Sequence, residues 1–187
     1  MIVKNKEEET LITALQDPST KEAAFRELVR TYQERLYWHI RKIVLDHDDA
    51  DDVLQETFIK IFRNITSFQG NSSLFTWMYR IATNESITHI NKKSRRNKIS
   101  DEEYNELALK NLESDVYFEG DAIQLKLQKA IATLPDRQRM VFNMRYFDEI
   151  PYKEMSKILE VTVGGLKSTY HIASQKIKLF LEDNETF

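Results

Sequence analysis

Cysteine is absent from this 187-residue chain, and glycine and proline are rare, with four and three copies respectively. Without thiols the chain forms neither a disulfide nor a thiolate metal site, which fits a reducing cytoplasm. Few chain-breaking residues and little strand-type alternation predict an all-helical fold. With 41% hydrophobic residues the chain has enough apolar side chains for a packed core in one or two small domains.

Long hydrophobic runs are also absent. No stretch approaches the roughly 18 apolar residues of a membrane-spanning helix. The first residues, MIVKNKEEETLITALQ, are acidic early and lack a long apolar segment, so we expect no signal peptide. The net charge of −3 is too small to argue against nucleic acid, because the local distribution of charge decides that.

Apolar residues recur at helical spacing in two blocks of the chain but not in the segment between them. Residues 99–121 carry eight acidic residues and one base, and their apolar residues keep poor period. We therefore predict two small helical domains, residues 1–97 and 120–187, joined by an acidic linker over residues 98–119. The second domain is expected to contain four helices.

The segment PYKEMSKILEVTVGGLKSTYHIASQKI, residues 151–177, predicts a helix-turn-helix. A short helix with an apolar face precedes the three-residue turn Glu160–Thr162, and a longer helix capped by Thr162 follows it. In DNA-binding units of this form the second helix enters the major groove. An ordinary helical hairpin with a solvated face explains the pattern as well. The outward, hydrogen-bonding residues of the second helix are Lys167, Ser168, His171, Gln175 and Lys178.

Adjacent glycines, Gly164 and Gly165, stand near the start of that second helix. In a helix each costs roughly 1 kcal/mol relative to alanine. A close approach of the backbone to DNA would explain them, and so would fraying of the helix end.

The helix predicted over residues 73–96 also has features of a nucleic-acid surface. Trp77 and Tyr79 flank its polar stripe, and five bases lie within seven residues at its end. Cations contact phosphates and aromatic rings stack on unpaired bases, so we predict nucleic-acid binding here. The alternative is a solvated, basic helix end that the helix dipole favours. The stripe is Thr76, Arg80, Thr83 or Asn84, Ile87 and Asn91, and the bases are Lys92, Lys93, Arg95, Arg96 and Lys98.

Three segments occur in order: DADDVLQETFIKIF, SSLFTWMYRIATN and LPDRQRMVFNMRYFDEIPYKEMSKILEVTVGGLKS. Together they resemble the extracytoplasmic-function (ECF) sigma factors of bacterial RNA polymerase, over about residues 8–182. The resemblance implies a promoter-specificity subunit, not an enzyme. Its first domain would bind core polymerase and recognise and melt the minus-10 element, and its second would read the minus-35 element.

The resemblance also implies roles for single residues. Asp52, Gln55 and Glu56 would contact the polymerase clamp. The implied partners are core RNA polymerase, promoter DNA and, as a family expectation, an anti-sigma factor; the free chain would be a cytoplasmic monomer without cofactor or metal. Trp77, Arg80, Asn84, Lys92, Lys93, Arg95 and Arg96 would bind minus-10 DNA, and Thr162, Lys167, Ser168, His171 and Gln175 would bind minus-35 DNA.

The sequence departs from the family pattern in its second domain. Gly165 replaces a usual threonine, and Thr169 and Ile172 replace usual arginines. A lost bidentate arginine contact is worth roughly 1–3 kcal/mol of base discrimination. Either the chain reads its own minus-35 sequence, or this domain binds DNA weakly. Glu160 also stands in the turn where glycine is typical, so the turn must tolerate Glu or carry strain.

Two other functions compete with this interpretation. A stand-alone helix-turn-helix regulator would bind a palindromic site as a dimer, yet no heptad seam is visible. A helical adaptor would leave the basic cluster unexplained. We expect no enzyme activity, because the sequence shows no set of a nucleophile, a base and an orienting group.

Five aspartates fall between Asp46 and Asp52. A calcium loop does not fit, because the required glycine and the bidentate Glu at loop position twelve are missing. We expect Asp48 or Asp49 to cap a helix and the face from Asp52 onward to meet a partner.

Overall fold

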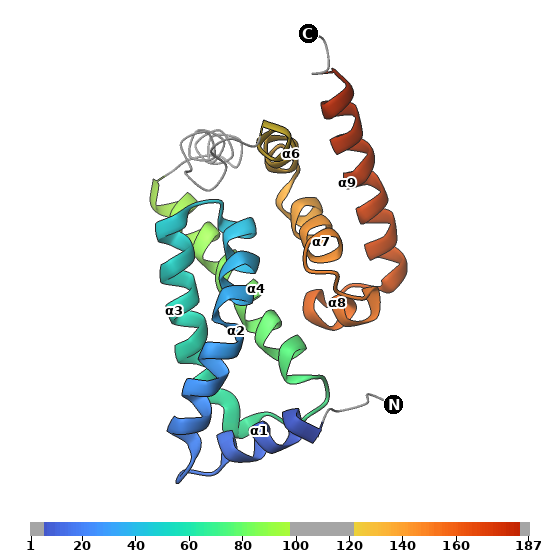
Figure 1. The fold of residues 1–187 in the computed structure, drawn as a ribbon. Coiled ribbons are helices and arrows are strands. Elements are labelled where there is room, and N and C mark those ends of the chain that lie inside the picture. The colour runs from blue at the N-terminus through green and yellow to red at the C-terminus, as the bar shows by residue number, and fades with distance from the viewer. Residues whose placement is uncertain (1–5, 98–121, 184–187) are drawn as a thin grey trace.

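The computed structural model describes residues 6–97 and 122–183 of the chain, so the predicted acidic linker lies outside the described residues (Figure 1). Within these ranges the chain is helical and contains no strand, which confirms the predicted fold class. None of the described helices is both long enough and apolar enough to cross a membrane. The elements are α1 (Lys6–Gln16), α2 (Lys21–Val44), α3 (His47–Asn64), the short 3-10 helix η1 (Ile65–Ser67), α4 (Leu74–Asn97), α6 (Ala122–Ala132), α7 (Asp136–Tyr146), α8 (Tyr152–Leu159) and α9 (Val163–Asp183).

Helices α2, α3 and α4 pack side by side, and α1 lies across their lower end in Figure 1. Apolar residues at three- and four-residue steps form the buried stripe of each helix, as the sequence predicts. Burial of these stripes against one another removes them from water and holds the three helices together. Fully buried members include Leu28, Leu36, Ile40, Ile61, Leu74 and Met78.

Helices α6 to α9 form the predicted four-helix domain. A second small core lies between α6, α7 and α9, and the ring of Phe142 stacks on Tyr146 and Tyr170 at centroid distances of 5.2 and 5.6 Å. The inner face of α8 is buried at Met155 and Ile158, as expected for a helix-turn-helix. At the start of α9, Thr162 Oγ1 accepts the amide of Gly165 at 3.2 Å, which confirms the predicted cap.

Polar residues ahead of α2 and α4 predict two further caps, at Ser19 or Thr20 and at Ser72, and both predictions are wrong. Ser73, and not Ser72, accepts the amide of Thr76 at the start of α4, at 3.1 Å. Thr20 precedes α2 but makes no side-chain cap, because its hydroxyl donates to a carbonyl of α1. Ser19 likewise turns back, toward a carboxylate in the preceding turn. In each case a neighbouring polar partner, invisible in the local sequence, takes the side chain.

The turn between α8 and α9 adopts a left-handed backbone. Glu160 ends α8 with φ of 55° and ψ of 38°, which confirms that the residue is held in a conformation that favours glycine. Its carboxylate lies 3.1 Å from Arg80 of α4, and both side chains are more than half exposed. This ion pair therefore offsets little of the backbone cost.

Glu160→Gly is expected to raise the free energy of unfolding by about 1 kcal/mol, because a left-handed non-glycine residue costs about that much. Urea unfolding followed by circular dichroism measures the change. Leu45 has a similar φ of 60° but is buried, so Leu45→Gly should instead destabilise the chain by creating a cavity. Equal effects of the two substitutions would show that strain at Glu160 is not what limits stability.

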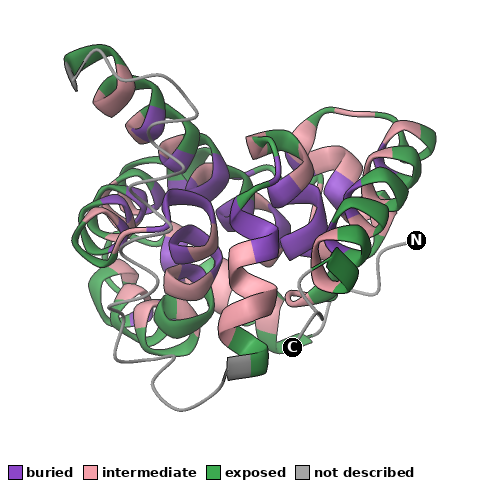
Figure 2. Cartoon of the chain, turned by 90° about the horizontal axis from the view of Figure 1, so that it is seen from above, coloured by how far each residue is buried: buried purple, intermediate pink, exposed green. Residues whose placement is uncertain are grey.

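The two predicted domains pack against each other. Helix α8 lies on α4, and α7 lies on α2. Met140, Val141 and Met144 of α7 and Met155 of α8 belong to the same buried cluster as the core of α2, α3 and α4. Figure 2 shows these buried segments on facing helices in the middle of the molecule. We call this packing the closed arrangement.

A buried polar network fastens the closed arrangement. Asp148, in the loop between α7 and α8, accepts hydrogen bonds from His39 Nδ1 at 3.0 Å and Lys42 Nζ at 2.6 Å. His39 also bonds Thr83 through Nε2 at 2.9 Å. Burial acts to raise the pKa of Asp148, but the hydrogen bonds and charges of His39 and Lys42 prevail and lower it. We call His39, Lys42 and Asp148 the interdomain network.

Candidate functional surfaces

The predicted docking residues share one exposed face of α3. Asp52, Gln55 and Glu56 are all exposed. None of their side chains forms a hydrogen bond or ion pair with another described residue. With residues of α4 they line a groove of about 350 Å³. Unpaired carboxylates beside a groove are open to hydrogen-bond donors of a partner protein. The α4 residues in the groove are Glu85, Thr88, His89 and Lys92.

The aspartates that precede this face have internal partners. Asp46 caps α3 by accepting the amide of Asp49 at 3.0 Å, so the expectation of a cap at Asp48 or Asp49 is wrong. The helix begins at His47, three residues before Ala50, where the run ADDVLQETFIKIFRNI predicts its start. Asp49 instead accepts a hydrogen bond from Lys93 and lies 3.1 Å from His89 Nε2. Asp49 therefore ties α3 to α4, and the predicted partner face begins beyond it.

The predicted minus-10 residues lie along one side of α4. Trp77 is half-buried, with its ring centroid 5.2 Å from that of Phe68. Arg80 and Asn84 are exposed. The described part of the basic cluster follows at the end of the helix, where Lys93 is engaged by Asp49. Lys92, Arg95 and Arg96 are exposed, and Lys98 is outside the described residues.

The second domain covers much of the polar stripe that the sequence places on α4. Thr76 is only 2% exposed and donates to Glu154 of α8 at 2.9 Å. Thr83 is only 1% exposed. Both belong to the predicted polar stripe of α4. Thr76 is covered by α8 of the second domain, whereas Thr83 bonds His39 of α2 within the first domain. Arg80 remains accessible only in part, since it faces Glu160.

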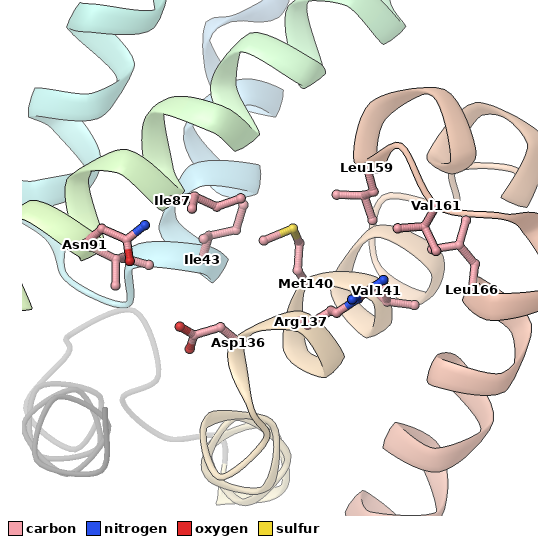
Figure 3. Close-up of a pocket in the computed structure, with 11 residues that line it drawn as sticks. Ile43, Ile87, Asn91, Asp136, Arg137, Met140, Val141, Leu159, Val161 and Leu166 are labelled. Atoms are coloured by element: carbon pink, nitrogen blue, oxygen red, sulfur yellow. The ribbon is translucent and has the colours of Figure 1, made fainter. Parts of the chain in front are cut away.

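A cavity of about 360 Å³ lies where the two domains meet. Ile43 and Ile87 reach toward Met140 from the first domain in Figure 3, and Leu159 and Val161 close the far side. The lining is mainly apolar, with Asp136 and Asn91 near one end and Arg137 beside Val141. The stripe of α4 that continues from Arg80 through Ile87 thus faces the second domain.

The outer face of α9 carries the predicted minus-35 residues. Leu166, Ala173 and Ile177 are buried against the rest of the domain, so the opposite side of the helix faces solvent. Hydroxyl, imidazole, amide and ammonium groups on this side are free to donate to phosphates or base edges. Exposed members are Thr162, Lys167, Ser168, His171 and Gln175.

Two features of these surfaces were not predicted from the sequence. His39 and Asp148 are 109 residues apart, and no local pattern links them. Ile172, noted only as a missing arginine, proves to be 48% exposed on the outer face of α9. An unmatched apolar residue on a predicted recognition helix was the available signal.

Comparison with known proteins gives consistent matches to one family. Residues 28–96 match the family Sigma-70 region 2, and residues 124–177 match Sigma-70, region 4. The RNA polymerase sigma-H factor of Pseudomonas aeruginosa is 32% identical over 167 residues, which cover 85% of this chain and 86% of that protein. The ECF RNA polymerase sigma factor SigW of Bacillus subtilis is 32% identical over 169 residues, covering 86% and 90%.

Solved structures share the fold. The sigma factor RpoE of Bartonella quintana, in complex with the anti-sigma factor NepR, has a TM-score of 0.67 at 19% identity, covering 86% of this chain and 98% of that chain. CnrH, in complex with the cytosolic domain of CnrY, has a TM-score of 0.68 at 18% identity, covering 95% and 99%. The helical architecture is therefore one that a known sigma factor and CnrH share.

Proposed function

Because this chain belongs to the extracytoplasmic-function sigma factors of bacterial RNA polymerase, and is a promoter-recognition subunit, we propose how its surfaces divide that work. Residues 1–97 dock on core polymerase and open the minus-10 element, and residues 120–187 read the minus-35 element. The observation that carries this division is the outer face of α9, which is solvated and rich in hydrogen-bond donors although its inner face is fully packed. The stand-alone regulator is not favoured.

The docking surface is the face of Asp52, Gln55 and Glu56. Their side chains are exposed and have no partner among the described residues, so no internal interaction must break when polymerase binds. The adjoining groove offers Lys92 and His89 as well. A partner surface with cations toward α3 and acceptors toward α4 would match it.

The minus-10 surface works through stacking and phosphate contacts. Trp77 and Arg80 supply planar groups that can hold unpaired bases, and Asn84 supplies an amide on the same side. Lys92, Arg95 and Arg96 neutralise the phosphates nearby. Strand opening then draws on binding energy, because extruded bases are stabilised as they leave the stack. No bond is made or broken, so the chain acts without catalysis and works where the polymerase works, in the cytoplasm.

The closed arrangement limits what the free chain can bind. Thr76 and Arg80 are engaged by α8 and the following turn, on the side of α4 that faces minus-10 DNA in this proposal. Polymerase binding would therefore have to separate the domains before the minus-10 surface is complete. An anti-sigma factor, the kind of partner named for the Bartonella quintana structure, would act by keeping polymerase away.

In vitro transcription from a randomised promoter library tests the proposal. With core polymerase present, the chain should enrich templates with defined minus-35 and minus-10 elements. Without polymerase, a gel shift with purified protein should give no specific complex at nanomolar concentration, and the free chain should have a monomeric mass. A dimer that binds a palindrome on its own would support the regulator instead.

A further inference from the structure

Ile172 lies on the outward ridge of α9, on the side of the helix away from the buried Leu166, Ala173 and Ile177. It is 48% exposed, between the exposed Ser168 one turn before it and Gln175 almost one turn after it. These three residues and Gly164 follow one another at three- and four-residue steps, which places them on one face of the helix. We call Gly164, Ser168, Ile172 and Gln175 the outer ridge.

The outer ridge carries no charge, whereas its flanks do. Lys167 and Lys176 are exposed on the two sides of the ridge, where helical periodicity directs them outward and sideways. In a helix that enters the major groove, such flanking cations meet the phosphates on either wall. The central ridge then meets the base edges.

Packing within the protein explains why position 165 is glycine, but it does not explain Gly164. A Cβ on Gly165 would lie 3.2 Å from both Thr162 Oγ1 and Val161 Cγ1, so packing within the turn favours glycine there. A Cβ on Gly164 would meet nothing within 4 Å. Alanine at Gly164 would meet no steric obstacle among the described residues and would favour the helix. Packing within the described structure therefore does not require glycine at this position.

We infer that Ile172 is a specificity-determining residue that recognises the C5-methyl group of a thymine in the minus-35 element, and that Gly164 lets the helix sit close enough for this contact. The inference rests on the proposed function. An alkyl side chain has no donor or acceptor, and the thymine methyl is the one apolar group that a base edge presents in the major groove. The residue that reads as a lost arginine contact thus replaces polar readout with apolar readout.

Deoxyuridine tests this directly because it lacks only the methyl group of thymine. The minus-35 element selected with the holoenzyme is remade with each thymine replaced in turn by deoxyuridine. At one position, holoenzyme with the unaltered chain should lose roughly threefold to fourfold in affinity, the effect of exposing about one methyl-sized apolar group. Holoenzyme carrying Ile172→Ala should bind the thymine and deoxyuridine templates equally at that position.

Three outcomes overturn the inference. In the first, no deoxyuridine substitution in the selected element changes the affinity of the holoenzyme. In the second, deoxyuridine still lowers the affinity when the holoenzyme carries Ile172→Ala. In the third, Ile172→Ala changes only the capture of a protein partner. Failure of the proposed function looks different, because then no promoter is selected with core polymerase at all. Leu179→Ala, which removes a 57% exposed apolar side chain two turns beyond Ile172 on α9, is the control and should keep the discrimination between thymine and deoxyuridine.

Gly164→Ala supplies a second, independent readout. The free chain should melt at a higher temperature, because alanine favours the helix and no atom of the described residues lies within 4 Å of its Cβ. Holoenzyme affinity for the selected minus-35 element should nevertheless fall several-fold, while transcription from a template that lacks this element should not change. Unchanged affinity for the minus-35 element would overturn the role of Gly164.

Discussion

Replacing Asp52, Gln55 and Glu56 together with alanine is expected to abolish transcription by the reconstituted holoenzyme. The three side chains are exposed and unpaired within the described residues, so their removal should change the free energy of unfolding by only about 0.5 kcal/mol or less. Binding to core polymerase should weaken by at least a hundredfold if two of them are central contacts worth about 2 kcal/mol each. Competition with a labelled sigma factor for core polymerase measures this loss.

A matched variant separates docking from general surface chemistry. Glu27, Gln33 and Glu34 are exposed on α2 and have nearly the same chemical composition as the docking residues. Their triple replacement with alanine should leave competition for core polymerase unchanged. If the α3 variant still competes as well as the unaltered chain, the docking surface lies elsewhere on the first domain.

Asp148→Asn is expected to loosen the closed arrangement. The substitution keeps the shape of the side chain but leaves Lys42, only 17% exposed, without its counter-charge. Breaking a buried pair costs about 3 kcal/mol or more, which corresponds to roughly a hundredfold shift toward separated domains. Because the chain has no cysteine, a single introduced pair can carry the fluorescent labels that report the distance between domains.

The sign of the pH dependence follows from the same contact. Folding lowers the pKa of Asp148 below its ordinary value of 3.8, so the contact contributes its full stability above that value. The contribution is lost as pH falls through the lowered pKa, and acid should separate the domains. Asp51→Asn is the control, since Asp51 is 59% exposed and lies 3.7 Å from His47. An Asp148→Asn chain with the same interdomain distance as the unaltered chain would contradict this role.

Local patterns predicted most of the helices and the helix-turn-helix. Apolar spacing places Met155, Ile158, Leu166 and Ala173 in the interior, and all four are buried. Thr162 was predictable as a cap because its role depends only on residues that directly follow it. At α2 and α4 the caps depend on which neighbour competes for each hydroxyl, and periodicity carries no information about that competition.

The packing between domains was not predictable for a related reason. Thr76 and Thr83 are polar residues whose partners lie on other helices, at Glu154 and His39. A polar residue on a helix face is predicted to face solvent unless its partner is known. The sequence therefore predicts one buried side of α4, whereas the structure has two. The exposure of Asp52, Gln55 and Glu56 on α3 was easier to predict, because no distant element of the described structure covers them.

The shared core has a consequence for how this chain unfolds. Family matches divide it into two regions, yet Met140, Met144 and Met155 belong to the cluster that also holds Ile40 and Met78. Neither region can lose its structure without exposing apolar surface of the other. Calorimetry should therefore record one cooperative melting transition, with the van't Hoff enthalpy equal to the calorimetric enthalpy. Since we propose that the domains separate when polymerase binds, we expect the chain to be least resistant to heat and proteases during that step.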